Sequence, residues 1–296
     1  MMIRSLVRSL VLAVLVPLMV PLMVPLAARA QGTEAAQDSA TLPRLAVASL
    51  IPAGFIGGII VLNQQAFWRY ATAVPFHISN DPPYAMHIDK LSHLYGSALG
   101  AAGMASAYRW AGLSSQNAAW TGGLLSLAAG VALELEDARH GNDPQYGLSP
   151  GDLVGDLLGA ALPVAQQYVP ALERVSFKLS VWPSAAYQSG AYKTLADDYE
   201  SQIYWASVDL HGLTALPPWL HLAVGAGCEN LMRQAYAVPA PGGRPYTVIY
   251  LSPDIDLRGL PIEAEWWHTA ASILRYVRIP LPALEVYPRA KMWVLR

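Results

Sequence analysis

Cysteine and charge are scarce in this sequence. The only cysteine is Cys228, so the chain can form no intramolecular disulfide and has no CxxC or zinc-type cysteine spacing. Charged residues make up 14 % of the 296 residues, against roughly 25 % in ordinary soluble proteins. The net charge of −2 is of mixed sign, so we expect no nucleic-acid partner. The motifs GxSxG, HExxH, the P-loop and the dinucleotide fingerprint are also missing, so the enzyme classes that use them are not indicated.

Apolar residues dominate instead. They make up 54 % of the chain and the mean hydropathy is positive, which favours a membrane or lipid as partner. Residues 1–30 have the pattern of a signal peptide: Arg4 and Arg8 precede an apolar core, and an A-x-A cleavage site follows at 28–30. We therefore expect an exported protein of the bacterial cell envelope, periplasmic or membrane-associated, with a retained N-terminal anchor as the alternative. No cysteine stands directly after this segment, so we expect no lipoprotein anchor.

The rest of the chain changes composition twice. Residues 31–43 form a flexible polar lead-in, 44–170 an apolar helical bundle with a buried polar cluster, and 171–296 a tryptophan-rich part that contains strands. The fold class that we expect is mainly α: about four apolar helices followed by a smaller α+β C-terminal part.

The helical pattern places these four helices at 45–68, 87–112, 117–137 and 150–168. The first carries no charge and is long enough for about 30 Å of hydrocarbon. Its proline and glycines suit a buried or re-entrant helix equally well, so the sequence leaves open whether it crosses a bilayer. In the C-terminal part, strict alternation predicts a strand at 175–182, and further strands are expected at 202–210, 221–227, 246–257 and 284–295. Three acidic residues there are expected to face solvent, namely Glu229, Asp254 and Asp256.

Acidic and basic side chains lie on the inner faces of the predicted helices. Asp89 and His93 share one helical stripe with Gly96 and Gly100, and glycines on such a stripe allow another backbone to approach closely. On the last helix, one face carries two acids and two glycines: Asp152, Gly155, Asp156 and Gly159. Both polar pairs should therefore point towards a common contact.

A third acidic group ends the helix between them. Glu134, Glu136 and Asp137 stand at a helix C-terminus, where carboxylates are disfavoured by roughly 0.3–1 kcal/mol each. A neighbouring cation must offset this cost, such as Lys90 or His93. One histidine and several carboxylates could form an oxygen-rich divalent-metal site, a general acid–base pair or a proton relay.

The candidate catalytic residues are therefore His93, Asp89, Glu134, Asp137 and Asp152. A divalent metal, the one cofactor considered, would be held by His93, Glu134, Asp137 and Asp156. The supporting residues are His77, Asp81, Lys90, Ser149 and Gly159.

Structural interpretations compete with these. Ser149 and Asp152 fit a capping box, and Asp89 suits a helix N-terminus. His93 could be a hydrogen-bonded structural histidine, and the whole cluster a buried polar network that holds the helices in register.

Two long segments resemble a known family. "FHISNDPPYAMHIDKLSHLYGSALG" and "ELEDARHGNDPQYGLSPGDLVGDLLGA" resemble the YfiM-like family of predicted periplasmic lipoproteins, a domain of unknown function. Its pattern of F-H-x-x-N-D, D-K-x-x-H, E-x-x-D and S-x-x-D-x-x-x-N-x-x-G maps onto this chain, and VanZ-like membrane proteins show a more distant likeness. Asp156 replaces the usual Asn, and Ala138 replaces the glycine expected after E-x-x-D. The resemblance implies an envelope location and a helical core with a polar centre, and it implies no activity.

Two functions follow from the sequence. The first is a structural or scaffolding envelope protein in which the polar centre fixes the helix packing. The second is a membrane-associated enzyme, hydrolase-like with acid–base or metal assistance, or a binder of lipids or small molecules. The sequence does not decide between them, and it leaves protein partners unknown.

Overall fold

The computed structural model describes residues 40–66, 68, 71–79, 84–141, 146–192, 194–231 and 244–293. The expected signal peptide, most of the lead-in and Asp81 lie outside these residues. The chain divides into two compact units, the first comprising residues up to 82 together with Lys90–Pro170, the second Pro83–Asp89 with Ala171–Arg296. Residues 83–89, which we assigned to the bundle, thus group with the C-terminal part. Each unit is described by itself below.

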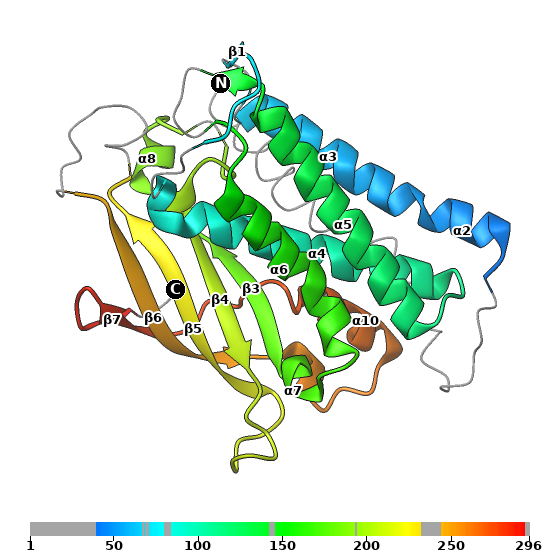
Figure 1. Cartoon of the computed structure of the whole chain (residues 1–296). Coiled ribbons are helices and arrows are strands. Elements are labelled where there is room, and N and C mark those ends of the chain that lie inside the picture. The colour runs from blue at the N-terminus through cyan, green and yellow to red at the C-terminus, as the bar shows by residue number, and fades with distance from the viewer. Residues whose placement is uncertain are drawn as a thin grey trace. The chain divides into compact units, whose positions relative to one another are not determined.

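The first unit is built of helices (Figure 1). Ser114 begins α5 by accepting a hydrogen bond from the Asn117 amide, and Ser149 begins α6 by accepting one from the Asp152 amide, with Pro150 in the first turn. A two-stranded sheet pairs Thr72–Ala73 (β1) with His140–Gly141 (β2). The helices are α2 (Leu42–Ala48), α3 (Leu50–Ala66), α4 (Ile88–Trp110), α5 (Ser115–Asp137) and α6 (Pro150–Gln166). Tyr84–His87 (η3), which is grouped with the second unit, is a short 3₁₀ segment that precedes α4 in the chain.

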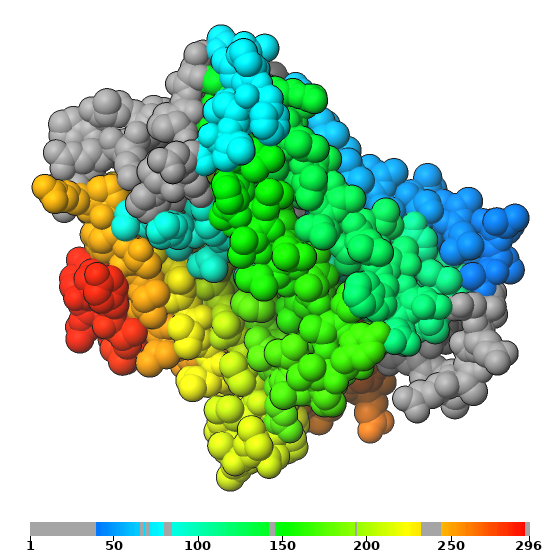
Figure 2. Space-filling view, in the orientation of Figure 1, coloured from blue at the N-terminus to red at the C-terminus, as the bar shows by residue number. Residues whose placement is uncertain are grey.

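The first expected helix, 45–68, is divided at Ser49 between α2 and α3. By length and composition alone, two stretches of the described chain could cross a bilayer: Leu42–Gln65, which is 11 % buried, and Ser115–Asp137, which is 44 % buried. Figure 2 shows α2 and α3 in blue along the surface of this unit, next to the green α5. The apolar side chains of α2 and α3 are therefore more exposed than those of α5.

Glycines bring the helix backbones together at most of the positions that the sequence suggested, with Gly96 as the exception. A Cβ added to Gly159 of α6 would lie 2.2 Å from the Leu94 carbonyl oxygen of α4, and one added to Gly155 would lie 2.7 Å from the Lys90 oxygen. A Cβ on Gly96 of α4 would meet nothing within 4 Å. The close approach between α4 and α6 is therefore made possible by the glycines of α6, whereas Gly96 is not a packing glycine.

The second unit contains a six-stranded antiparallel sheet in which the strands follow one another in chain order. This agrees with the expected strand-containing C-terminal part, and the last expected strand is divided into two. The strands are β3 (Val175–Val181), β4 (Gln202–Val208), β5 (Leu220–Glu229), β6 (Tyr246–Ile255), β7 (Ala283–Tyr287) and β8 (Lys291–Trp293). Short helical segments connect them, namely α7 (Pro170–Glu173), α8 (Ala185–Gln188), η4 (Tyr199–Ser201), η5 (Leu257–Gly259) and α10 (Glu265–Leu274).

One face of this sheet is buried and unusually polar. Trp205 and Tyr250 pack at its middle, but Lys178 and Asp254 also lie on it, exposed by only 1 % and 0 %. The expectation that Asp254 and Asp256 face solvent is therefore wrong, since Asp256 is only 2 % exposed. The alternation was recognised correctly, but the polar side of the strands faces inwards.

Candidate functional site

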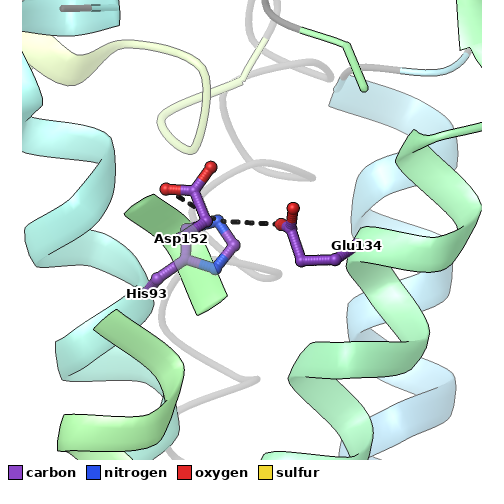
Figure 3. Close-up of side chains that lie close together, drawn as sticks. All are labelled: His93, Glu134 and Asp152. Atoms are coloured by element: carbon purple, nitrogen blue, oxygen red, sulfur yellow. Dashed lines mark ion pairs between the residues drawn. The ribbon is translucent and has the colours of Figure 1, made fainter. Parts of the chain in front are cut away.

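The polar centre of the first unit joins three helices. His93 comes from α4, Glu134 from the last turn of α5, and Asp152 from the first turn of α6 (Figure 3). His93 Nε2 lies 3.9 Å from Glu134 Oε1 and 3.9 Å from Asp152 Oδ1. The three side chains thus converge on the outer nitrogen of the imidazole.

The other imidazole nitrogen, Nδ1, contacts a buried carboxylate of α6. His93 Nδ1 lies 3.2 Å from Asp156 Oδ1, and the Ser97 hydroxyl donates to the same oxygen at 2.7 Å. The Ser126 hydroxyl of α5 donates to the Ser97 carbonyl oxygen at 2.9 Å. A Cβ on Gly130 of α5 would lie 2.4 Å from Asp156 Oδ2, so glycine at this position makes room for the carboxylate.

The N-terminal turn of α6 completes the centre. The Ser149 amide donates to Glu134 Oε2 at 2.8 Å, while the Ser149 hydroxyl caps the helix. Lys90 Nζ forms an ion pair with Asp152 Oδ1 at 3.2 Å. Ser149 therefore has the capping role that we considered, and it also orients Glu134. Asp152 is both a first-turn acid and the partner of Lys90.

Opposite charges around His93 outweigh the effect of its burial. Burial by itself lowers the pKa of His93, but the hydrogen bond to Asp156 and the charges of Asp152, Asp156 and Glu134 raise it to about 10. The imidazole is then a cation at neutral pH with a proton on each nitrogen, and its Nδ1 donates to Asp156.

The carboxyl of Glu134 behaves in the opposite way. Its burial raises its pKa to about 8, although the charge of His93 and the Ser149 amide lower it in part. At neutral pH, Glu134 is therefore largely protonated, and two cations, Lys90 and His93, face the carboxylates of Asp152 and Asp156. The charges of the centre balance.

Asp137 lies beside this centre rather than in it. Burial raises its pKa to about 6, partly offset by a hydrogen bond from the Trp68 indole N–H. The Trp68 ring stacks on His140 at a centroid distance of 5.0 Å. Ala138 ends α5 with ordinary right-handed dihedrals, φ −59° and ψ −13°, so the glycine usual at this position is not required.

The expected supporting residues are distributed around the unit. His77 Nε2 lies 3.2 Å from the Tyr146 carbonyl oxygen and helps to hold the segment before α6. Gly159 packs on Leu94 as described above. Asp89 is buried and is grouped with the second unit, and its role in the site stays a prediction.

Three atoms are placed so that they could bind a cation: His93 Nε2 and one carboxylate oxygen each of Glu134 and Asp152, all within 4.8 Å of one another. The sequence predicted Asp137 and Asp156 as metal ligands beside His93 and Glu134. In the structure, the third residue of the converging group is Asp152. Ligand atoms on a tetrahedral zinc ion at about 2.0–2.1 Å lie about 3.3 Å apart, and the distances from His93 are 3.9 Å. Cation binding would require the side chains to move together and His93 to lose a proton.

The sequence analysis missed a buried charged network in the second unit. Asp254 Oδ2 lies 2.6 Å from Lys178 Nζ, and Asp254 Oδ1 lies 2.9 Å from Arg278 Nη1. Ser207 donates to Asp254 Oδ2 at 2.6 Å and lies 3.3 Å from His221 Nδ1. Because the Ser207 proton is directed to the carboxylate and the residue is fully buried, the arrangement is not that of an activated nucleophile. The polar side of β3 was the signal that could have revealed this network.

Comparison with known proteins concerns the helical unit. The chain matches no curated protein and no solved structure. Residues 80–167 match the model of a family described as predicted periplasmic lipoprotein (DUF2279). The matched segment contains His93, Glu134, Asp152 and Asp156 of the polar centre, and the likeness to VanZ-like proteins stays a prediction. Residues 80–167 are thus similar to a periplasmic lipoprotein family of unknown function, and the match confirms the expected location of the protein in the cell envelope.

Proposed function

We propose that the protein is a structural component of the bacterial cell envelope, and that its polar centre fixes the packing of α4, α5 and α6. The observation that carries this proposal is the charge balance of the centre. Lys90 and His93 of α4 face Asp152 and Asp156 of α6, so each helix neutralises the buried charges of the other. A buried charge left without its partner is strongly destabilising, so this pairing favours a single arrangement of the helices.

The hydrogen bonds around the charges support the same role. Asp156 accepts from His93 and Ser97, and Glu134 accepts from the Ser149 amide. These hydrogen bonds orient the carboxyl groups, while Asp156 Oδ2 has no hydrogen-bond partner among the described residues, so we attribute the specific packing mainly to the paired charges.

We further propose that the unit contacts a membrane through α2, α3 and α5. Large apolar side chains are exposed on these helices, whereas the charged side chains described above point inwards. On α5 the exposed apolar side chains form one stripe, since their spacing of 4, 7 and 4 residues repeats on one helix face. The side chains concerned are Leu42 and Val47 of α2, Leu50, Ile60 and Val61 of α3, and Trp120, Leu124, Val131 and Leu135 of α5.

The structural role is tested by metal analysis and unfolding of the same preparations. The full chain and the double variant His93→Ala/Asp152→Ala are purified, and each is unfolded with and without EDTA. We expect the parent's stability to be independent of EDTA and the variant to be markedly less stable. A stoichiometric metal in the parent that is lost in the variant, together with EDTA sensitivity, would refute a purely structural centre.

Membrane contact is tested by flotation with neutral phosphatidylcholine vesicles. The double variant Ile60→Lys/Val61→Lys places two charges on the apolar surface and should reduce flotation several-fold. Gln64→Lys adds a charge to the same helix at an exposed polar position and should float like the parent. Equal flotation of all three proteins would contradict membrane contact through α3.

A second candidate function rests on the convergence of the three potential ligand atoms. With a divalent cation bound to His93, Glu134 and Asp152, the centre could serve metal-assisted hydrolysis or small-molecule binding. Without a metal, the centre has an acid, Glu134, with a pKa of about 8, close to the value that suits proton transfer at neutral pH. The metal analysis above distinguishes this candidate from the structural role.

A further inference from the structure

The buried face of the sheet in the second unit holds more positive than negative charge. Lys178 and Arg278 are exposed by only 1 % and 2 %, and both pair with the same carboxylate, Asp254. One carboxylate can balance only one of these two cations. Burial lowers the pKa of Arg278, and the charge of Asp254 offsets this only in part, as expected for a cation that is incompletely balanced.

The neighbouring groups do not remove this excess. Burial lowers the pKa of His221, so its imidazole is neutral at pH 7. Asp256 forms an ion pair with Arg258, and this pair adds no net charge. Asp209 lies 3.9 Å from His221 Nε2, and its side chain is 31 % exposed.

Arg275 adds another cation at the rim of the same face. Its Nη2 lies 3.4 Å from the Ser176 hydroxyl, and Ser176 is in register with Ser207 on the next strand. Ser207 donates to Asp254, the partner of Arg278, so the two arginines lie over one region of the sheet. Over the described residues, no carboxylate pairs with Arg275. The described part of this region thus holds four cations, Lys178, Arg258, Arg275 and Arg278, against three carboxylates, Asp209, Asp254 and Asp256.

Three buried donors in this region have no acceptor among the residues that the structure describes. Two of them are the Nε–H groups of Arg275 and Arg278. The third is the Ser176 hydroxyl, since its oxygen accepts from Arg275 and its own proton remains to be donated. Buried donors without an acceptor are costly. Water could accept these hydrogen bonds, but it would leave the excess positive charge unbalanced.

We infer that this region binds an oxyanion of the phosphate type between Arg275 and Arg278. The edge of a guanidinium group binds phosphate oxygens through charge-assisted hydrogen bonds. A phosphate group also supplies the missing negative charge, and its oxygens point in several directions, as donors on two arginines and one serine require. A planar carboxylate offers its oxygens in one plane only.

The anion would enter from the side of Arg275. This side chain is partly exposed, whereas Arg278 is deeply buried. A free phosphate ion and the phosphate of a lipid head group have the same chemistry here, and the experiment separates them. The site lies in the second unit, so it does not depend on the structural role proposed for the polar centre.

The first measurement is calorimetric titration of the purified full chain with inorganic phosphate at pH 7, with chloride at equal ionic strength as the control for screening. We expect saturable binding to the parent. Arg275→Gln should bind roughly tenfold more weakly or worse, because it loses the charge and the two-pronged edge of the guanidinium. Circular dichroism should show that this variant keeps its fold, since Arg275 lies at the rim.

Arg174→Gln is the matched control. Arg174 is a partly exposed arginine of the same unit, and its Nη1 donates to the carbonyl oxygens of Asp209 and His211. Because these donors are already satisfied, Arg174→Gln should bind phosphate as tightly as the parent.

A second variant tests the charge excess without changing either arginine. Lys178→Met removes one buried cation, so less charge remains for the anion to balance. Phosphate should raise the Tm of the parent, because a ligand that binds only the folded state stabilises it. It should raise the Tm of Lys178→Met much less.

Phosphorus analysis identifies the source of the anion. The parent and Arg275→Gln are purified in buffers without phosphate and extracted with chloroform and methanol. Phosphorus that enters the organic phase from the parent but not from Arg275→Gln would identify a lipid head group, and phosphorus in the aqueous phase a soluble phosphate.

Two results would overturn the inference. One is a parent that shows no saturable binding of phosphate beyond the effect of chloride. The other is phosphate binding by Arg275→Gln and Lys178→Met as tight as that of the parent. Either result would mean that water and the Trp205 ring, 3.7 Å from the Arg278 guanidinium, are sufficient partners for these cations.

Discussion

His93 Nδ1 lies 3.2 Å from Asp156 Oδ1, and this contact connects α4 to α6 inside the helical unit. It pairs a histidine cation with an acid at a position where the family pattern of the sequence analysis has Asn. An amide there would accept a hydrogen bond but would not balance the charge of the imidazolium. The additional acid therefore accounts for much of the raised pKa of His93.

The first prediction concerns this contact. His93→Ala should lower the free energy of unfolding by about 3 kcal/mol, because it leaves Asp156 buried without its cation. His93→Asn should cost about half as much, since its amide can still donate to Asp156. Chemical denaturation at pH 7 measures both. Identical stability of the two variants and the parent would show that the contact contributes nothing.

The second prediction concerns pH. The pKa of His93 rises from 6.5 to about 10 on folding, so its stabilising contribution is complete below pH 6.5 and is lost as the pH rises to about 10. The pKa of Glu134 rises from 4.5 to about 8, so folding also favours its protonated form. The native state binds more protons over this range, and the free energy of unfolding should fall with rising pH by up to about 1.4 kcal/mol per pH unit for each group. Urea titrations at several pH values test this, and a stability that rises from pH 7 to 9 would contradict it.

The third prediction separates the charge of Glu134 from its shape. Because this carboxyl is largely protonated at neutral pH, Glu134→Gln should change stability at pH 7 by less than about 1 kcal/mol. Glu134→Ala should cost about 2 kcal/mol, since the buried Ser149 amide loses its acceptor. Thermal unfolding of the two variants side by side is the measurement. A Gln variant as unstable as the Ala variant would mean that the ionised form is the important one.

The fourth prediction concerns the glycines. Gly159→Ala should destabilise the helical unit by about 1–3 kcal/mol, because its Cβ would collide with the backbone of α4 at Leu94. Gly96→Ala is the matched control: its Cβ meets nothing within 4 Å, and alanine should stabilise the helix by up to about 1 kcal/mol. The sign of the two changes in denaturant midpoint decides the prediction, and destabilisation by both would contradict it.

The fifth prediction concerns the second unit. Asp254→Ala leaves Lys178 and Arg278 as buried cations without their shared carboxylate and should cost about 3–5 kcal/mol. Lys178→Met should cost much less, because Arg278 still pairs with Asp254 and the methionine chain fills the space of the lysine stem. Differential scanning calorimetry of both variants provides the comparison. A larger loss for Lys178→Met would place the important pairing elsewhere.

The long helices α4, α5 and α6, most of the strands, and the residue types of the polar centre were predicted from the sequence alone, whereas α10 and the division of the first helix into α2 and α3 were not. Long apolar stretches, the Ser149 cap and the alternation after Val175 are local signals, because each depends on neighbouring residues or on one helix turn. The placement of His93 and Asp152 on inward helix faces follows from the same periodicity. Local patterns of this kind carry no information on which faces meet.

Only the tertiary structure decided which partners these residues find. The close approach of α4 and α6 depends on Gly155 and Gly159 rather than on Gly96. Two helices can approach closely when either one lacks side chains at the contact, and the sequence does not show which of the two it is. Asp254 is buried because Lys178 and Arg278, distant in the sequence, reach it across the sheet. Alternation along a strand predicts that the two faces of the sheet differ in polarity. Which face becomes buried depends on where the rest of the chain packs, and this is not encoded in the strand itself.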